Sequence, residues 1–201
     1  MIALALALFI AAAGGPDDLD LPRSLSLDEF KFSAPAAPPP DFALFVTAHI
    51  GTAGAYDADN PCFLIGGGAR LHILPWLGAD ASIDFQTKQK VKEPGPDASI
   101  FQVPFEFAAL FYPPLQLPFR PYGAAGLGWT VTDVTAPGPG NDSTSGNLLF
   151  FIGFGAEFEL SSHFFVTADL RFVFAQDPPH SGSFSADWIQ FTLGLMLKLT
   201  K

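Results

Sequence analysis

The feature that most constrains the fold is a pair of alternating runs between residues 147 and 175. In the first run, residues 148–160, apolar side chains occupy every second position, and the intervening positions from Gly153 to Glu159 carry glycine and glutamate. The second run, residues 164–175, alternates in the same way, and a Ser-Ser-His tripeptide joins the two. Alternation with a period of two across a short polar turn is typical of an antiparallel β-hairpin. We therefore predict a hairpin with one apolar face and one face of charged and small residues.

The same alternation recurs in eight segments from Phe42 onward. Each is near or above the roughly nine to eleven residues that a tilted strand needs to cross a bilayer. The segments are Phe42–Ala53, Phe63–Leu74, Gly78–Lys88, Ser99–Tyr112, Phe119–Asp133, Asn147–Leu160, Phe164–Gln176 and Ala186–Leu199.

The connections between these segments alternate in length. Short connections occupy residues 75–77, 113–118 and 161–163. The longer ones, rich in Asp, Gly, Pro and Ser, occupy residues 54–62, 89–98, 134–146 and 177–185. Short periplasmic turns and longer extracellular loops are typical of barrels in the bacterial outer membrane. An even number of strands then places the N- and C-termini in the periplasm.

The composition also favours a membrane location. The chain has 22 Phe among 201 residues, and only 15% of its residues are charged, which is few for a soluble β-domain. No run reaches the roughly eighteen uninterrupted apolar residues of a spanning helix. Only helices and closed barrels satisfy their backbone polar groups in lipid. We therefore predict an all-β fold, an eight-stranded antiparallel up-and-down transmembrane β-barrel.

Volume decides which face of the strands points inward. An eight-stranded barrel has an interior just wide enough for its own side chains, and the Phe-rich face would not fit there. The charged and glycine-bearing face is therefore predicted to line the lumen. Because charges in so narrow a lumen must pair or be solvated, we expect Arg70, Arg120 and Arg171 to form salt bridges with Asp80, Glu106, Glu157 and Asp169. The inward set also contains His49, His72, Asp84, Glu159 and Lys198.

Aromatic residues should collect where the barrel meets water on each side. The predicted interfacial aromatics are Trp76, Tyr112 and Tyr122 near the short turns, and Trp129 and Trp188 near the long loops. Pro104 lies inside a predicted strand, where it removes a hydrogen-bond donor and indicates a β-bulge.

The N-terminal region has a different character. Residues 1–13 form a short apolar stretch that ends in three alanines, as in a secretory signal peptide. The usual positively charged opening is missing, and a buried helix or membrane anchor is the alternative. Residues 14–41 are acidic and rich in proline, which predicts a disordered periplasmic arm. The barrel then covers residues 42–201.

Three passages resemble the small OmpA-like and OmpX-like eight-stranded outer-membrane barrels. They are the turn and strand at residues 74–82, the Arg-Pro-Tyr strand at residues 120–129, and the last strand at residues 192–199. The resemblance implies that Thr192, Gly194, Leu197 and Leu199 belong to the signal read by the barrel-assembly machinery. The terminal aromatic residue usual in that signal is absent, and Leu199 stands in its place. The resemblance specifies architecture rather than activity, because one barrel hosts many functions.

The leading functional hypothesis is a non-catalytic envelope barrel, monomeric and surrounded by outer-membrane lipid. Its long loops, at 54–62, 89–98, 134–146 and 177–185, could contact a surface partner. A small channel or a transporter of small or apolar solutes is the alternative. A lipid A-modifying enzyme is a remote third, for which the candidates are His180, Ser181, Ser183 and Asp187. The net charge of −10 argues against a nucleic-acid partner, and the sequence contains no cofactor or metal motif.

Overall fold

The computed structural model describes residues 42–55, 61–91, 98–135, 143–176 and 187–200, and every regular element in these ranges is a strand. The strands are β1 (Ala43–Ala55), β2 (Cys62–Leu74), β3 (Leu77–Gln86), β4 (Gln89–Val91), β5 (Ala98–Phe111), β6 (Arg120–Thr135), β7 (Ser143–Glu159), β8 (Phe164–Ala175) and β9 (Trp188–Lys198). In the described part of the chain no helix is long and apolar enough to cross a membrane. The predicted signal peptide and arm, residues 1–41, lie outside the described residues.

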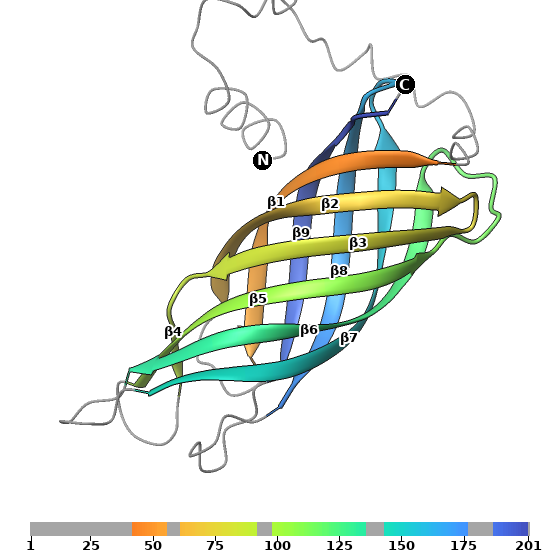
Figure 1. Cartoon of the computed structure of the whole chain (residues 1–201). Helices are drawn as coiled ribbons and strands as arrows, with labels where there is room; N and C mark the ends of the chain where they lie inside the picture. The colour runs from red at the N-terminus through yellow and green to blue at the C-terminus, as the bar shows by residue number, and fades with distance from the viewer. Residues whose placement is uncertain (1–41, 56–60, 92–97, 136–142, 177–186, 201) are drawn as a thin grey trace, which may run out of the picture. The chain divides into compact units, whose positions relative to one another are not determined.

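The strands form one closed antiparallel barrel (Figure 1). Consecutive strands pair with each other except β3 and β4, β3 pairs instead with β5, and β9 pairs with β1. The short β4 only extends the wall beside β5. Eight strands therefore close the barrel, and the prediction of an eight-stranded up-and-down β-barrel is confirmed.

Most strand ends lie within two residues of those predicted from alternation, and two differences change the pairing. The predicted segment Gly78–Lys88 ends as β3 at Gln86, and a separate β4 begins at Gln89 within a predicted loop. Strand β7 begins at Ser143, before the alternating run, because residues 143–146 pair with β6 as far as Val134. These residues are polar or small and show no alternation of apolar and polar side chains. Their backbone pairing with β6 extends the strand, and the sequence pattern does not predict this extension.

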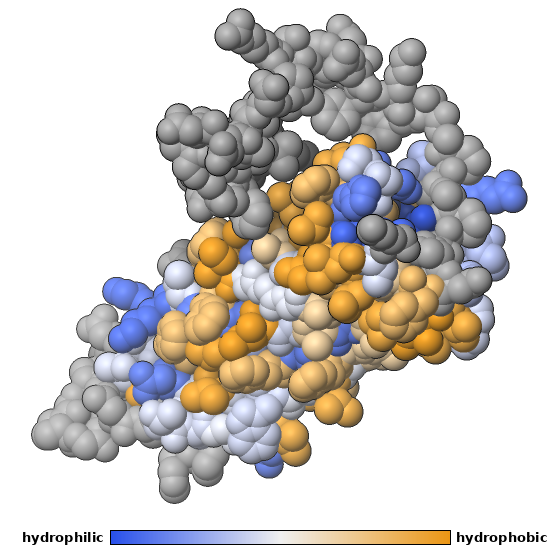
Figure 2. Space-filling view, turned by 45° about the horizontal axis from the view of Figure 1, so that its top comes forward, coloured by the Kyte–Doolittle hydropathy of each residue, from blue (hydrophilic) through white to orange (hydrophobic). Residues whose placement is uncertain are grey.

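Apolar side chains cover the outside of the barrel wall. Leu127 and Phe107 are 65% and 61% exposed, and orange side chains dominate much of the wall visible in Figure 2. The burial of β9 alternates residue by residue, with Thr192 buried and Leu193 exposed. An outward apolar band with a polar interior is the pattern of a transmembrane barrel.

Large apolar residues also occupy parts of the lumen, which the volume argument did not anticipate. Ala43, Phe45, Phe165 and Met196 form a buried cluster at the end where β1 begins and β9 ends. Phe151 lies in a second buried cluster. Glycines on the neighbouring strand make room for such rings. A Cβ on Gly126, which is paired with Phe151, would lie 2.5 Å from its ring.

The irregularity predicted at Pro104 lies on one side of β5 only: toward β3 and β4 the register shifts by one residue between Ile83↔Phe105 and Gln89↔Ile100. The register between β5 and β6 runs without a shift from Ser99↔Thr135 to Phe111↔Gly123, with Pro104 opposite Thr130. The proline marks the point where the ladder between β3 and β5 ends, at Ile83↔Phe105. A missing N–H thus ends the pairing on one side of the strand and leaves the other side continuous.

Candidate functional site

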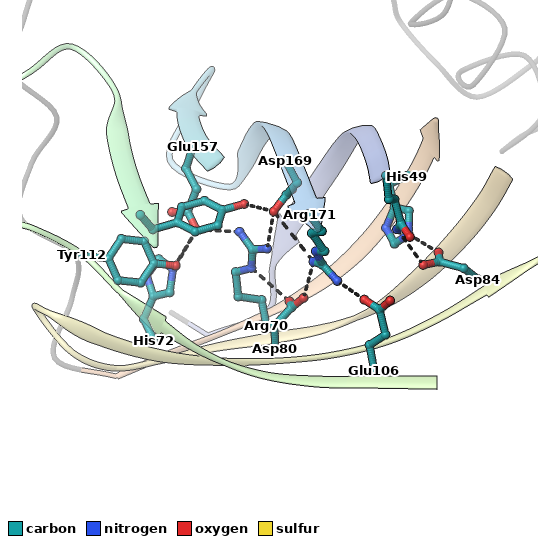
Figure 3. A network of polar contacts seen from close by, with 12 residues as sticks. His49, Arg70, His72, Asp80, Asp84, Glu106, Tyr112, Glu157, Asp169 and Arg171 are labelled. Atoms are coloured by element: carbon teal, nitrogen blue, oxygen red, sulfur yellow. Dashed lines mark hydrogen bonds and ion pairs between the residues drawn. The ribbon is translucent and has the colours of Figure 1, made fainter. Parts of the chain in front are cut away.

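The candidate site is the polar lumen, where charged residues from five strands meet (Figure 3). Each occupies an inward position of its strand and is nearly completely buried. The central residues are Arg70 on β2, Asp80 on β3, Glu106 on β5, Glu157 on β7, and Asp169 and Arg171 on β8.

Arg70 joins strands on different sides of the lumen. Its Nε donates to Oδ1 of Asp80 on the neighbouring strand at 3.0 Å. Its Nη1 donates to Oε1 of Glu157 on β7, also at 3.0 Å. Its Nη2 lies 3.8 Å from Oδ1 of Asp169. The guanidinium also lies over the ring of Tyr122, with its Cζ 4.7 Å from the ring centroid, a favourable cation–π geometry.

Arg171 makes the equivalent contacts from β8. Its Nη2 donates to Oδ2 of Asp80 at 3.2 Å, and its Nη1 donates to Glu106 across the lumen. Its Nη2 also lies 3.8 Å from Asp169. Asp80 therefore uses one carboxylate oxygen for each arginine. Buried charges persist only when they are paired and hydrogen-bonded, and these contacts supply both.

A second group of contacts lies nearer the end of the barrel at which β1 begins and β9 ends. The Tyr112 hydroxyl donates to Oε1 of Glu157 at 2.7 Å, and His72 Nε2 lies 3.2 Å from the same oxygen. The Tyr112 hydroxyl and His72 Nε2 are 3.0 Å apart. Tyr122 donates in the same way to Asp169. Hydroxyl donors thus add to the arginine contacts of Glu157 Oε1 and Asp169 Oδ1, whereas Oε2 of Glu157 has no hydrogen-bond partner in the described part of the chain.

A third group lies toward the long loops. Asp84 contacts His49 Nε2 through one carboxylate oxygen, and accepts a hydrogen bond from Gln190 Nε2 at 3.1 Å through the other. Trp188 Nε1 donates to Gln190 Oε1 at 3.3 Å. The two contacts of Asp84 join strands that are not neighbours, because β3 pairs with neither β1 nor β9, whereas the Trp188–Gln190 hydrogen bond lies within β9.

The lumen contains more buried acid than buried base. In the described residues, two arginines face five buried carboxylates: Asp80, Asp84, Glu106, Glu157 and Asp169. His49 and His72 each contact one of these carboxylates. Acidic side chains therefore outnumber basic ones at this site.

Arg120 and Glu159 lie apart from the central residues, at the rim where β6 begins and β7 ends. Arg120 Nη2 is 3.9 Å from Oε2 of Glu159, whose side chain is 37% exposed. The central contacts with Asp80, Glu106, Glu157 and Asp169 described above are made by Arg70 and Arg171.

The prediction of interfacial aromatics is wrong for Tyr112, Tyr122 and Trp188. These three are 4%, 2% and 1% exposed and point into the lumen, whereas Trp76 and Trp129 are 50% and 46% exposed on the outside. The position of these residues near a strand end does not decide whether their side chains face the lumen or the outside of the barrel. Each inward ring occupies an inward position of the alternation and has a polar atom that donates within the lumen, to Glu157, Asp169 or Gln190.

The last strand alternates as the sequence pattern requires. Thr192 is buried and Gly194 lies against Thr167 in the lumen, whereas Leu197 and Leu199 are exposed outside. Recognition of these residues by the assembly machinery stays a prediction. Of the remote enzymatic candidates, His180, Ser181 and Ser183 lie outside the described residues. Asp187 accepts a hydrogen bond from the Ala175 backbone N–H at 3.1 Å.

Comparison with solved structures supports the fold. Neisserial surface protein A superposes with a TM-score of 0.55 at 16% identity, covering 80% of this chain and 98% of that one. OprG from Pseudomonas aeruginosa gives 0.54 at 13% identity, covering 80% and 97%. Ail of Yersinia pestis, in complex with the heparin analogue sucrose octasulfate, gives 0.50 at 12% identity, covering 79% and 97%.

The sequence comparisons give the family. None of the curated proteins matches the chain significantly. The family described as outer membrane protein beta-barrel domain matches residues 29–196, which include every described strand except the end of β9. This chain therefore belongs to the outer membrane protein beta-barrel domain family, whose place is the bacterial outer membrane.

Proposed function

We propose that the protein is a non-catalytic structural or surface-contact barrel whose lumen does not conduct. The observation that carries this proposal is the set of contacts across the lumen. Arg70 on β2 reaches Glu157 on β7, and Arg171 on β8 reaches Glu106 on β5. β2 is not adjacent to β7 in the sheet, and β8 is not adjacent to β5. Side chains that hold opposite walls together leave no open path through so narrow a barrel.

Conductance of the purified protein in planar bilayers tests this proposal against the channel alternative. The expected result is no large, steady single-channel current at neutral pH. A general porin treated in the same detergent is the positive control, and a detergent blank is the negative one. A large, steady current from the folded protein would refute the closed lumen and favour a channel, for which the acidic lumen would select cations.

We infer that both termini lie in the periplasm and that the long loops face outward. The supporting observation is that residues 75–76, 112–119 and 160–163 connect strands at the same end of the barrel as the start of β1 and the end of β9. An epitope inserted within residues 136–142 should be labelled on intact cells. An epitope after Lys201 should be labelled only after the outer membrane is permeabilised. The reverse result would invert the orientation.

A surface partner of the long loops would be cationic. Ail was solved with a sulfated sugar analogue, and shares this fold. The loops of this chain instead contain Asp57, Asp59, Asp142 and Asp177, which repel sulfate groups. Cells that produce the protein should bind fluorescent polylysine more than control cells do, and labelled heparin no more. Replacement of these four residues by Asn should abolish the difference.

The absence of catalysis is part of the same proposal, as are the monomeric state and insertion by the barrel-assembly machinery. The fold-sharing proteins compared above are outer-membrane barrels, and their common architecture supplies no catalytic group by itself. Mass spectrometry of lipid A from overproducing cells should show no change. A shifted lipid A mass that disappears with Ser181→Ala or Ser183→Ala would make the protein an enzyme.

A further inference from the structure

In the described residues of the barrel wall, the backbone pairing of β5 with β3 and β4 is interrupted at one place. Pairing runs from Leu77↔Phe111 to Ile83↔Phe105 and stops, and it resumes between β4 and β5 at Gln89↔Ile100. We call the unpaired stretch the seam: residues 84–88 on one side and residues 101–104 on the other. On its other side β5 stays paired with β6 throughout the seam.

The direction of the proline nitrogen explains the break. The Tyr112 N–H donates to Trp76 O on the β3 side of the strand, at 2.9 Å. Alternate residues of a strand direct their N–H groups to the same neighbour, and Pro104 precedes Tyr112 by an even number of positions. Its nitrogen therefore faces β3, where the continued register would place Asp84. Because proline has no N–H, it cannot complete this hydrogen-bonded pair.

Each side of the seam is held by its other neighbour. Thr87 N donates to Phe63 O at 2.8 Å, and Phe63 N donates to Thr87 Oγ1 at 3.0 Å, so the end of β3 follows β2. The facing part of β5 follows β6. The two sides can therefore separate without breaking another ladder, and a local opening of this kind costs less than unfolding the barrel.

Unsatisfied polar atoms lie behind the seam in the upper lumen, the part between Arg171 and the long loops. In the described part of the chain, Oε1 of Glu106 and Nε2 of Gln86 have no hydrogen-bond partner. Both residues are more than nine-tenths buried. Such groups require water or a ligand. Gln86 Nε2 and the likewise unpartnered Nε of Arg171 are donors, which water can satisfy. The free Glu106 oxygen is an acceptor, and because buried carboxylates outnumber buried arginines in the described lumen, the ligand favoured at Glu106 is a cation that carries N–H donors.

We propose that the seam is a lateral port through which small cationic molecules reach the carboxylates of the upper lumen from the membrane side. Gln86 and Gln102 are buried at the seam, so entry requires local separation of β3 from β5. Passage ends at Arg171, whose contacts with Asp80 and Glu106 span the lumen. The port therefore gives access to a closed chamber, and conduction through the barrel is not required.

Cys62 is a natural reporter of this access, because it is the only cysteine. It is buried, with its Sγ 3.7 Å from Gln86 Oε1. The full-length folded protein in phosphatidylcholine vesicles is treated with ammonium-bearing and sulfonate-bearing methanethiosulfonates of similar size. The ammonium reagent should label Cys62 faster. Pro104→Val restores the missing donor, and should slow labelling about fivefold, as one restored hydrogen bond implies.

Pro121→Val is the matched control. Pro121 also lies in a strand, but its register with β7 is continuous at Ala156, so labelling should not change. The heat-dependent gel mobility of each variant reports whether it is folded. Equal labelling of the wild type and Pro104→Val would show that access comes from the loop end and would overturn the proposal. An unreactive Cys62, or faster labelling by the sulfonate reagent, would overturn it too.

Hydrogen exchange of the wild type supplies a test independent of any variant. The amides of Gln86 and Gln102 face the seam by the alternation described above, whereas those of Ser82 and Ala108 lie within the paired part of the ladder. The two seam amides should exchange faster than the two paired ones. If all four are equally protected, the seam does not open, and the port is refuted even if Pro104→Val fails to fold.

Discussion

Removal of one central arginine should destabilise the barrel far more than removal of the rim arginine. Arg70→Met keeps much of the side-chain volume but removes the charge that contacts Asp80, Glu157 and Asp169. Breaking a buried ion pair by removing one partner costs about 3–5 kcal/mol, because it leaves an uncompensated buried charge. The loss of the cation–π contact with Tyr122 adds about 0.5–2 kcal/mol. We therefore expect a loss of about 3.5–7 kcal/mol in the free energy of unfolding.

Arg120→Met is the matched control. Its contact with Glu159 is 3.9 Å long, and the Glu159 side chain is partly exposed. The Glu159 end of this pair is partly solvated, so the loss of this one contact contributes about 0–1 kcal/mol. The substitution is chemically the same, in the same barrel, and removes the same formal charge. The difference between the two variants therefore compares an arginine that pairs with three buried carboxylates with one whose ion pair is long and partly solvated.

Urea titration of the protein folded in phosphatidylcholine vesicles measures both losses through tryptophan fluorescence. Reversibility is checked by coincident folding and unfolding curves. The double variant Arg70→Met/Glu157→Gln should recover part of the lost free energy of unfolding, because it removes one of the carboxylates that Arg70→Met leaves without its arginine partner. If Arg70→Met costs no more than Arg120→Met, the lumen is wet enough to solvate its charges, and the argument for a closed lumen fails.

Two further predictions follow from the inward and outward sides of the wall. Gly126→Ala should destabilise the barrel by about 1–3 kcal/mol, since its Cβ would lie 2.5 Å from Phe151, whereas Gly123→Ala, with no atom within 4 Å of its Cβ, should be nearly neutral. Urea titration of the pair checks this, and equal costs would contradict the lumen packing. Brominated acyl chains should quench the fluorescence of Trp129 but not that of Trp188, measured in single-tryptophan variants, and the opposite order would reverse their assigned faces.

The architecture was predictable because it depends on signals within a strand. Alternation gives the strands, and connection length gives the up-and-down order. The narrow interior then decides that Phe107 and Leu127 face outward. The same reasoning mistook Tyr112 and Trp188 for interfacial residues, because it used distance along the chain from a turn instead of position in the alternation. Strict alternation from Glu106 would have placed Tyr112 inside.

The specific contacts of the lumen could not be predicted from the sequence, because they depend on register between strands. The sequence shows that Arg171 and Glu106 face inward, but not that they meet across the barrel. Nor does it show which side of β5 the Pro104 nitrogen faces, and therefore which of the two ladders of β5 is interrupted there. That direction follows only from the hydrogen bond between Tyr112 and Trp76.

The register explains how so narrow a lumen holds so many charges. Most buried charges of the lumen lie opposite a residue with little or no side chain on a neighbouring strand. The pairs are Arg171 with Gly153, Asp169 with Gly155, Glu106 with Gly128, Asp84 with Gly66, and Asp80 with Ala108. The space left by each small residue admits a long polar side chain toward the barrel axis. A slip of one residue would turn every side chain of a strand to the other face, so charges would meet lipid and Phe would enter the lumen. The glycines and the charges therefore specify one register together, which neither set could do alone.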